Sequence, residues 1–98
     1  MKGKKYDSDK LEWDLIPFET LEEVVKVLMY GTKKYSKYNW QIVGNAEVRY
    51  FNALLRHLFA FKKGEKTDPE TGLSHISHAL CCLIFLKWVE DKKLREQK

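Results

Sequence analysis

Two histidines stand three residues apart in the segment DPETGLSHISHA, directly before the longest apolar run of the chain. Residues with this spacing share one face of a helix, so His75 and His78 can hold one metal ion or one phosphate group together. The start of a helix adds free backbone N–H groups and the positive end of the helix dipole, which both favour an anion. The alternative for each imidazole is an ordinary packing role with a hydrogen bond at the edge of the core.

Three acidic residues lie just upstream of this histidine pair. Glu65, Asp68 and Glu70 offer carboxylate oxygens, which hard divalent cations prefer as ligands. Together with the two imidazoles they form the expected set of metal ligands. Asp68 has a second interpretation as the cap of the next helix, because Pro69 follows it at a position that suits the first helical residue. Glu65 has a second interpretation as a plain surface residue.

A second group of candidate residues lies in the segment KKYSKYNW, which combines basic, aromatic and amide side chains. Tyr35 and Trp40 have flat faces on which a base can stack, and Asn39 can hydrogen-bond to a base edge or a ribose. Lys34 suits a phosphate. The alternative for Trp40 is a structural role, since a tryptophan near a helix end often fills a gap in the core.

Arg56 and His57 lie between these two groups, on a segment with helical periodicity. Arg49, Asn52 and Arg56 recur at three- and four-residue spacing and therefore share a polar face. Arg56 and His57 come within reach of the histidine pair if the helices on either side of the following loop pack antiparallel. For Arg56, contact with an anion competes with a salt bridge to Glu70.

The apolar periodicity predicts helices only, because no segment alternates between apolar and polar residues as a strand does. The first helix is predicted to start at Thr20, which has the spacing of a capping box with Glu23, and to end near Tyr35. The second helix is predicted over residues 46–63, with Asn45 as its cap and a glycine just past its end.

The third predicted helix runs from Pro69 or Leu73 to the low nineties and is apolar nearly all round. Such a helix needs cover on several sides, which three helices of this length do not easily provide. We therefore expect an all-α fold, a small bundle of three to four helices that is completed by oligomerisation. Residues 1–98 form one domain in this interpretation, with flexible ends at 1–13 and 93–98.

Composition and charge argue against several classes of protein. The formal net charge is +4, much of it near the two ends, so an anionic partner is allowed but not required. Glu47 interrupts the basic face of the second helix, which argues against nucleic acid as the ligand. The apolar run is shorter than the roughly 20 residues that span a bilayer, and no leader peptide is visible. Adjacent Cys81 and Cys82 cannot easily pair, and reduced thiols fit a cytoplasmic protein.

Four segments of the chain, taken in order, resemble one known family. KLEWDLIP, YGTKKYSKYNW, RYFNALLRHLFAFKKGE and DPETGLSHISHA are similar to the N-terminal domain of dATP/dGTP diphosphohydrolases, a family of small, often phage-encoded proteins. The similarity extends over roughly residues 9–88. It implies an all-α fold that binds a purine nucleotide and converts dATP or dGTP to the monophosphate and pyrophosphate. The family pattern falls on Lys34, Tyr35, Asn39, Trp40, Arg56, His57, Glu65, Asp68, Glu70, His75 and His78.

The resemblance also implies a role for each of these residues. The catalytic residues would be Glu70, Asp68 and His75. The nucleotide would be bound by Lys34, Tyr35, Asn39, Trp40, Arg56, His57 and His78. A divalent metal, Mg²⁺ or Mn²⁺, would be held by Glu65, Asp68, Glu70, His75 and His78. The metal would activate water for attack on the α-phosphorus, and Arg56 and Lys34 would neutralise the charge that develops on the phosphates.

A second function would use the same residues without hydrolysis. A non-catalytic sponge would sequester a cyclic nucleotide or a related immune signal and so block anti-phage defence. The histidine pair and Arg56 would then hold phosphates, Tyr35 or Trp40 would stack on the purine, and no metal would be needed. The enzyme and the sponge differ only in whether water is activated, and the sequence leaves both open.

Overall fold

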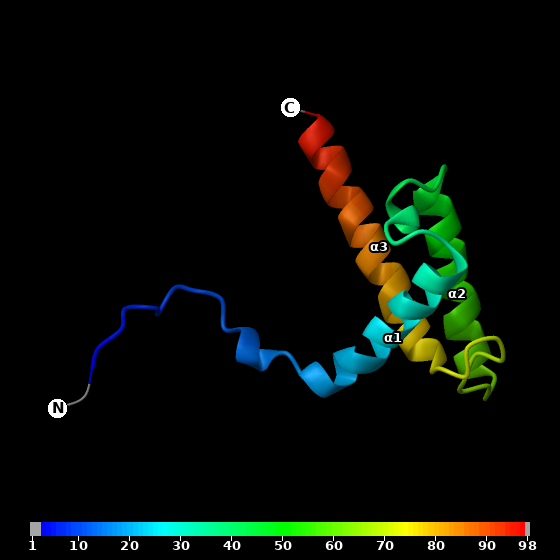
Figure 1. Ribbon diagram of the computed structural model, residues 1–98, viewed down its shortest axis with the longest axis horizontal. Helices are drawn as coiled ribbons and strands as arrows, with labels where there is room; N and C mark the ends of the chain where they lie inside the picture. Colours follow the sequence, from blue (N-terminus) through cyan, green and yellow to red (C-terminus); the bar gives the residue numbers. More distant parts are fainter. Residues whose placement is uncertain (1–2, 98) are drawn as a thin grey trace.

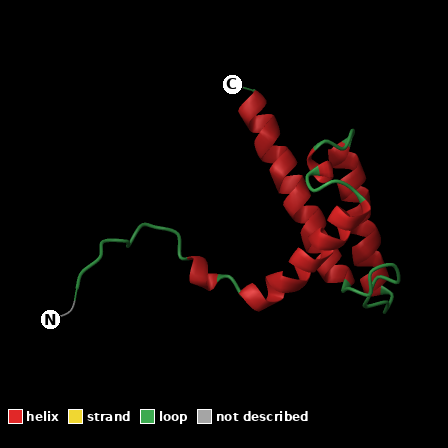
Figure 2. Cartoon of the chain, viewed as in Figure 1, coloured by secondary structure: helices red, strands yellow, loops and turns green. Residues whose placement is uncertain are grey.

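The computed structural model describes residues 3–97, and the regular elements in this range are all helices (Figures 1 and 2). The predicted all-α class is therefore confirmed. The three α-helices are α1 (Phe18–Lys34), α2 (Ala46–Lys62) and α3 (His75–Glu96). Two short 3-10 helices precede α1 and α2, namely η1 (Trp13–Leu15) and η2 (Asn39–Gln41). Residues 1, 2 and 98, which belong to the expected flexible ends, lie outside the described residues.

α3 is the central element, because α1, α2 and η2 all contact it. Figure 1 shows α2 running beside α3, with α1 crossing near the start of α3. Residues 3–12, ahead of η1, run away from the helices as a loop (Figure 2). None of the described helices combines the length and the apolar character needed to cross a membrane.

Two small apolar clusters on different sides of α3 form the core. Cys81 packs with Val24 of α1, whereas Cys82 and Ala79 pack with Leu54 of α2. Successive residues of a helix point about 100° apart, so the two neighbouring thiols serve two different helix interfaces. This arrangement explains why α3 is apolar on several sides and carries small side chains where its neighbours approach.

An aromatic cluster anchors the η2 segment on α3. Trp40 stacks on Phe85 with ring centroids 4.6 Å apart, and it lies edge-on to Trp88 at 5.2 Å. The hydroxyl of Tyr50 donates a hydrogen bond to the Trp40 carbonyl at 2.8 Å, which ties the segment to α2 as well. One face of the Trp40 ring is therefore occupied by the protein itself.

The limits of α1 and α2 largely follow the predictions, but one predicted cap is wrong. α2 covers residues 46–62, and Gly64 follows it with a φ of 103°, a value that favours glycine. α1 ends at Lys34, next to the predicted end, but it begins at Phe18. Thr20 therefore lies inside the first turn of α1 and is not its cap. Asn45 does occupy the cap position of α2, though its side chain makes no capping hydrogen bond.

The last helix begins later than predicted. The Ser74 hydroxyl oxygen accepts hydrogen bonds from the backbone N–H groups of Ile76 at 3.0 Å and of the next residue at 3.5 Å. α3 therefore starts at His75 rather than at Pro69 or Leu73. Ser74 is the cap of α3 because its side chain accepts hydrogen bonds from the first free backbone N–H groups of the helix.

The last helix also ends later than predicted. α3 continues to Glu96, so residues 93–96 of the expected flexible end are helical. Lys93 forms an ion pair with Glu47 at the start of α2, which shows that α2 and α3 run antiparallel.

Several large apolar side chains remain exposed on this small chain. The exposed fractions are 63% for Trp13, 57% for Phe18 and 61% for Phe59. Completion of the bundle by oligomerisation would cover such side chains, and it stays a prediction.

We predict that both thiols resist alkylation in the native protein. Burial raises the pKa of Cys81 to about 12 and that of Cys82 to about 11, so almost no thiolate is present at pH 8. Iodoacetamide at pH 8 should modify the native chain at least ~100-fold more slowly than the chain unfolded in urea, where the thiol pKa returns to about 8.5. Mass spectrometry gives both rates, and equal rates would contradict the packing of α3.

Candidate functional site

An open cavity of about 770 Å³ lies between the C-terminal half of α1, the η2 segment, α2 and α3. Its size is that of pockets that hold small organic ligands. Seven of the predicted site residues line it: Lys34, Tyr35, Asn39, Trp40, Arg56, Glu70 and His78. The other four predicted residues lie in a polar cluster beside it: His57, Glu65, Asp68 and His75.

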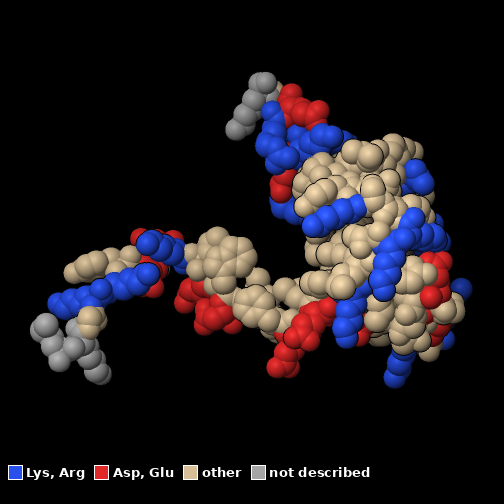
Figure 3. All heavy atoms as spheres, viewed as in Figure 1, with Lys and Arg blue, Asp and Glu red and all other residues tan. Residues whose placement is uncertain are grey.

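Positive charge dominates the lining of the cavity. The charged residues among its described lining are Lys34, Lys37, Arg49 and Arg56 against one carboxylate, Glu70. Glu70 lies 3.6 Å from the Nζ atom of Lys34, so its ion-pair partner is this lysine and not Arg56. Basic side chains are spread over the helical body in Figure 3. Such a surplus of cations favours an anionic ligand.

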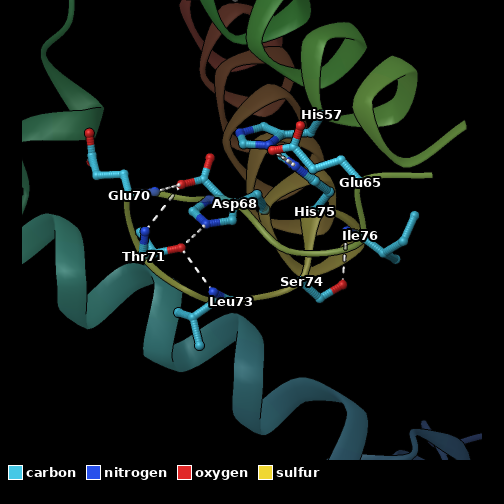
Figure 4. A network of polar contacts seen from close by, with 10 residues as sticks. His57, Glu65, Asp68, Glu70, Thr71, Leu73, Ser74, His75 and Ile76 are labelled. Atoms are coloured by element: carbon cyan, nitrogen blue, oxygen red, sulfur yellow. Dashed lines mark hydrogen bonds and ion pairs between the residues drawn. The ribbon is translucent and has the colours of Figure 1, made fainter. Parts of the chain in front are cut away.

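Asp68 shapes the loop between α2 and α3 (Figure 4). Its Oδ1 atom accepts hydrogen bonds from the backbone N–H groups of Glu70 at 2.8 Å and Thr71 at 3.1 Å. The interpretation of Asp68 as the cap of α3 is therefore wrong, because its carboxylate closes a turn instead. Thr71 Oγ1 lies 2.7 Å from His78 Nε2 and accepts a hydrogen bond from the N–H of Leu73. The turn thus fixes His78 on the wall of the cavity.

Three imidazoles meet beside this turn. His57 Nδ1 lies 2.9 Å from His75 Nδ1, and the His57 ring stacks on His78 with centroids 4.6 Å apart. His75 is only 4% exposed, and its Nε2 atom lies 3.2 Å from Glu65 Oε1. The antiparallel packing of α2 and α3 brings His57 to the histidine pair, as expected. His75 and His78, however, have different hydrogen-bonding partners.

Burial lowers the pKa of His57 and of His78, and the neighbouring imidazoles lower that of His57 further. Both rings are therefore neutral at pH 7, the state in which an imidazole nitrogen can bind a metal. Burial by itself raises the pKa of Asp68. The hydrogen bonds that its carboxylate accepts from the backbone N–H groups of Thr71 and Glu70 have the opposite effect, and the pKa is lowered overall. The Asp68 carboxylate is therefore ionised at neutral pH.

His57, Asp68 and His75 form the closest group of candidate metal ligands among the described residues. Each offers one ligand atom, and these atoms lie within 4.8 Å of one another. Asp68 and His75 belong to the expected metal set, whereas His57 was expected to bind the nucleotide. Two imidazoles and a carboxylate are a donor set that suits a divalent cation.

The remaining three members of the expected metal set have other contacts. The Glu65 carboxylate contacts the Nε2 atom of His75, Glu70 forms an ion pair with Lys34, and the His78 ring contacts the Thr71 hydroxyl. Their roles as metal ligands stay predictions.

Tyr30, Lys37 and Thr71 are among the cavity-lining residues that the sequence interpretation left out. Tyr30 lies one helical turn before Lys34, and this spacing is a signal that could have identified it. Burial and the nearby carboxylate of Glu70 raise the Tyr30 pKa. Thr71 could not have been found in this way, because its contact with His78 depends on the shape of the turn.

Glu23 links α1 to the start of α3. Its Oε1 atom accepts a hydrogen bond from the backbone N–H of Ser74 at 2.7 Å, across 51 residues of sequence. The predicted capping box within α1 is therefore wrong, since the Glu23 carboxylate is used by another helix. The contact holds the first turn of α3 against α1, next to the imidazoles.

Comparison with known proteins identifies relatives of the chain. A family model described as "dATP/dGTP diphosphohydrolase, N-terminal" matches residues 1–98. A protein named dATP/dGTP diphosphohydrolase from Salmonella phage PMBT28 is 39% identical over 93 residues. That alignment covers 95% of this chain and 31% of the relative, so the chain spans about a third of that protein. No solved structure matches the chain.

We predict that Glu23→Ala lowers the free energy of unfolding by about 1–2 kcal/mol, because the Ser74 N–H loses a charged acceptor. Glu22→Ala is the matched control, since Glu22 is exposed on the same helix. Glu23→Gln keeps an oxygen acceptor and should lose less. Urea unfolding followed by circular dichroism measures all three, and equal losses for Glu23→Ala and Glu22→Ala would exclude the proposed link.

Proposed function

Because the chain belongs to the family of dATP/dGTP diphosphohydrolase N-terminal domains, we propose that its cavity binds a purine deoxynucleoside triphosphate. We further propose that the bound nucleotide is hydrolysed to the monophosphate and pyrophosphate with the help of a divalent cation. The name of the phage relative, dATP/dGTP diphosphohydrolase, supports this reaction. The compartment would be the cytoplasm of an infected bacterium.

The charge of the cavity is the observation that carries the proposal. Four cationic side chains against one carboxylate leave an excess of three positive charges, which matches a polyphosphate. Arg56 is exposed on α2, and its planar guanidinium suits two phosphate oxygens at once. Lys34 is half-exposed in its contact with Glu70 and can turn to a phosphate without leaving a buried charge behind.

The purine end of the site would lie near the η2 segment. Tyr35 is 55% exposed at the cavity, so its ring can take a base on one face. One face of Trp40 already stacks on Phe85, so we expect its main role to be to position the η2 segment rather than to stack on the base. Asn39 lines the same part of the cavity and offers an amide to a base edge or a ribose hydroxyl.

For hydrolysis, His57, Asp68 and His75 would hold the cation, which supplies a Lewis acid and a more acidic bound water. The cluster adjoins the cavity wall, because the His57 ring stacks on His78. Glu70 has a largely exposed side chain at the cavity and can accept a proton from water. Lys34 and Arg56 would balance the negative charge that grows on the phosphates in the transition state.

The sponge remains the second candidate because the cavity itself carries only one carboxylate among its described lining residues. Binding of an anion there needs no cation. Incubation of the protein with dGTP, dATP or cyclic dinucleotides, with Mn²⁺ or with EDTA, separates the two functions. Formation of dGMP or dAMP only with metal supports the hydrolase. Intact ligand that is retained in EDTA and released by heat would establish the sponge instead.

We predict that Arg56→Gln weakens dGTP binding by at least about tenfold, because one phosphate contact of roughly 1.4 kcal/mol is lost. Lys62→Gln serves as the control, since it removes the same charge from α2 at a position outside the cavity lining. Calorimetry in EDTA measures binding without turnover. Equal affinities for the two variants would show that the nucleotide does not use this cavity.

A further inference from the structure

His57, Asp68 and His75 come from three different parts of the chain and meet at one point. His57 lies on α2, Asp68 in the turn and His75 at the first position of α3, as the close-up in Figure 4 shows. Their ligand atoms lie within 4.8 Å of one another. A group bound to all three would therefore join two helices and the loop between them.

The spacing of the two imidazole nitrogens matches a chelate. Metal–nitrogen bonds of about 2.0–2.1 Å place two ligand nitrogens roughly 3.3–3.4 Å apart at the tetrahedral angle and about 2.9 Å apart at 90°. The Nδ1 atoms of His57 and His75 lie 2.9 Å apart. The same distance could be a hydrogen bond only if one ring carries its proton on Nδ1.

Glu65 fixes the tautomer of His75. Its Oε1 atom lies 3.2 Å from His75 Nε2, so the ring proton belongs on Nε2 and the Nδ1 lone pair faces His57. A carboxylate behind a histidine is the usual support of a metal-bound imidazole. His75 is 4% exposed, so its ring is held in place without an ion.

The backbone holds the loop in the same arrangement. The N–H of His75 donates to the Lys66 carbonyl at 2.9 Å, and the N–H of Asp68 donates to the Leu73 carbonyl at 2.8 Å. Both ends of the loop are thereby fixed next to the first turn of α3. The ligand set is therefore largely organised before any ion binds, which lowers the cost of binding.

We propose that His57, Asp68 and His75 bind one transition-metal ion, of the Zn²⁺, Mn²⁺ or Co²⁺ class, independently of any nucleotide. Two nitrogens and one oxygen suit such ions, whereas Mg²⁺ and Ca²⁺ require mostly oxygen ligands. Glu65 supports His75 from outside the ligand set, and His78 contacts Thr71 and is not a ligand. The proposal names the ion class for the site that the proposed hydrolysis would use. It is argued from the geometry of the cluster alone, so it can hold without hydrolysis, whereas the proposed hydrolysis depends on it.

The test uses the tag-free chain after dialysis against EDTA. Co²⁺, Zn²⁺, Mn²⁺ and Mg²⁺ are added separately, and thermal unfolding and the visible absorption of Co²⁺ are recorded without nucleotide. We expect one Co²⁺ to bind per chain, with a visible absorption spectrum that differs from that of free aqueous Co²⁺ because nitrogen atoms ligate the ion. We also expect Zn²⁺ at 100 times its Kd to raise the Tm by about 5 °C or more. Mg²⁺ at the same concentration should leave Tm unchanged.

Variants identify the ligands. His57→Gln and Asp68→Asn should each weaken Co²⁺ binding by at least about tenfold, and circular dichroism checks that both fold. His78→Gln removes the neighbouring imidazole and should leave Co²⁺ binding within about twofold of the wild type. Unchanged binding in His57→Gln, loss in His78→Gln, or a Tm rise with Mg²⁺ alone would overturn the proposal. Metal binding without any hydrolysis of dGTP would sink only the proposed activity.

Discussion

The packing of α3 between α1 and α2 is the constraint on which the rest of the structure depends. Ala79 and the two cysteines are small enough for both neighbours to approach, and each cysteine faces a different helix. An apolar helix with two partners cannot move along one without losing contact with the other. Its first turn is therefore fixed relative to both, and this turn carries His75.

Polar residues at the start of such a helix follow from the same geometry. The first N–H groups of α3 lie where two helices and a loop converge, so water cannot satisfy them fully. The Ser74 hydroxyl and the Glu23 carboxylate take up that role. The imidazoles of His75 and His78 are then held by Glu65 and Thr71. Each of these two histidines in the first turns of α3 thus has a hydrogen-bonding partner within the protein, and their positions are set before any ligand arrives.

The sequence allowed the fold class and the limits of α2 to be predicted, because apolar periodicity and a glycine after the helix are local signals. The starts of α1 and α3 were predicted less accurately. Thr20 and Glu23 have capping-box spacing, yet Glu23 is drawn to Ser74 on a helix distant in sequence. Asp68 and Ser74 both suit a cap, and the choice between them depends on the turn. Local patterns do not contain these tertiary contacts.

The candidate site shows the same division between local and tertiary information. The types of its residues were evident from the sequence, because imidazoles, carboxylates and cations gather in two short segments, KKYSKYNW and GEKTDPETGLSHISH, and in Arg56 and His57 between them. The sequence also placed His57 near the histidine pair on the condition that the helices pack antiparallel, as α2 and α3 do. It did not group His57 with Asp68 and His75 as candidate metal ligands, because that grouping depends on the turn that carries Asp68. His57 contacts His75 through one nitrogen and stacks on His78, which lines the cavity. An ion on His57 would orient the ring that supports the cavity wall, so the two sites would share a residue without sharing a ligand.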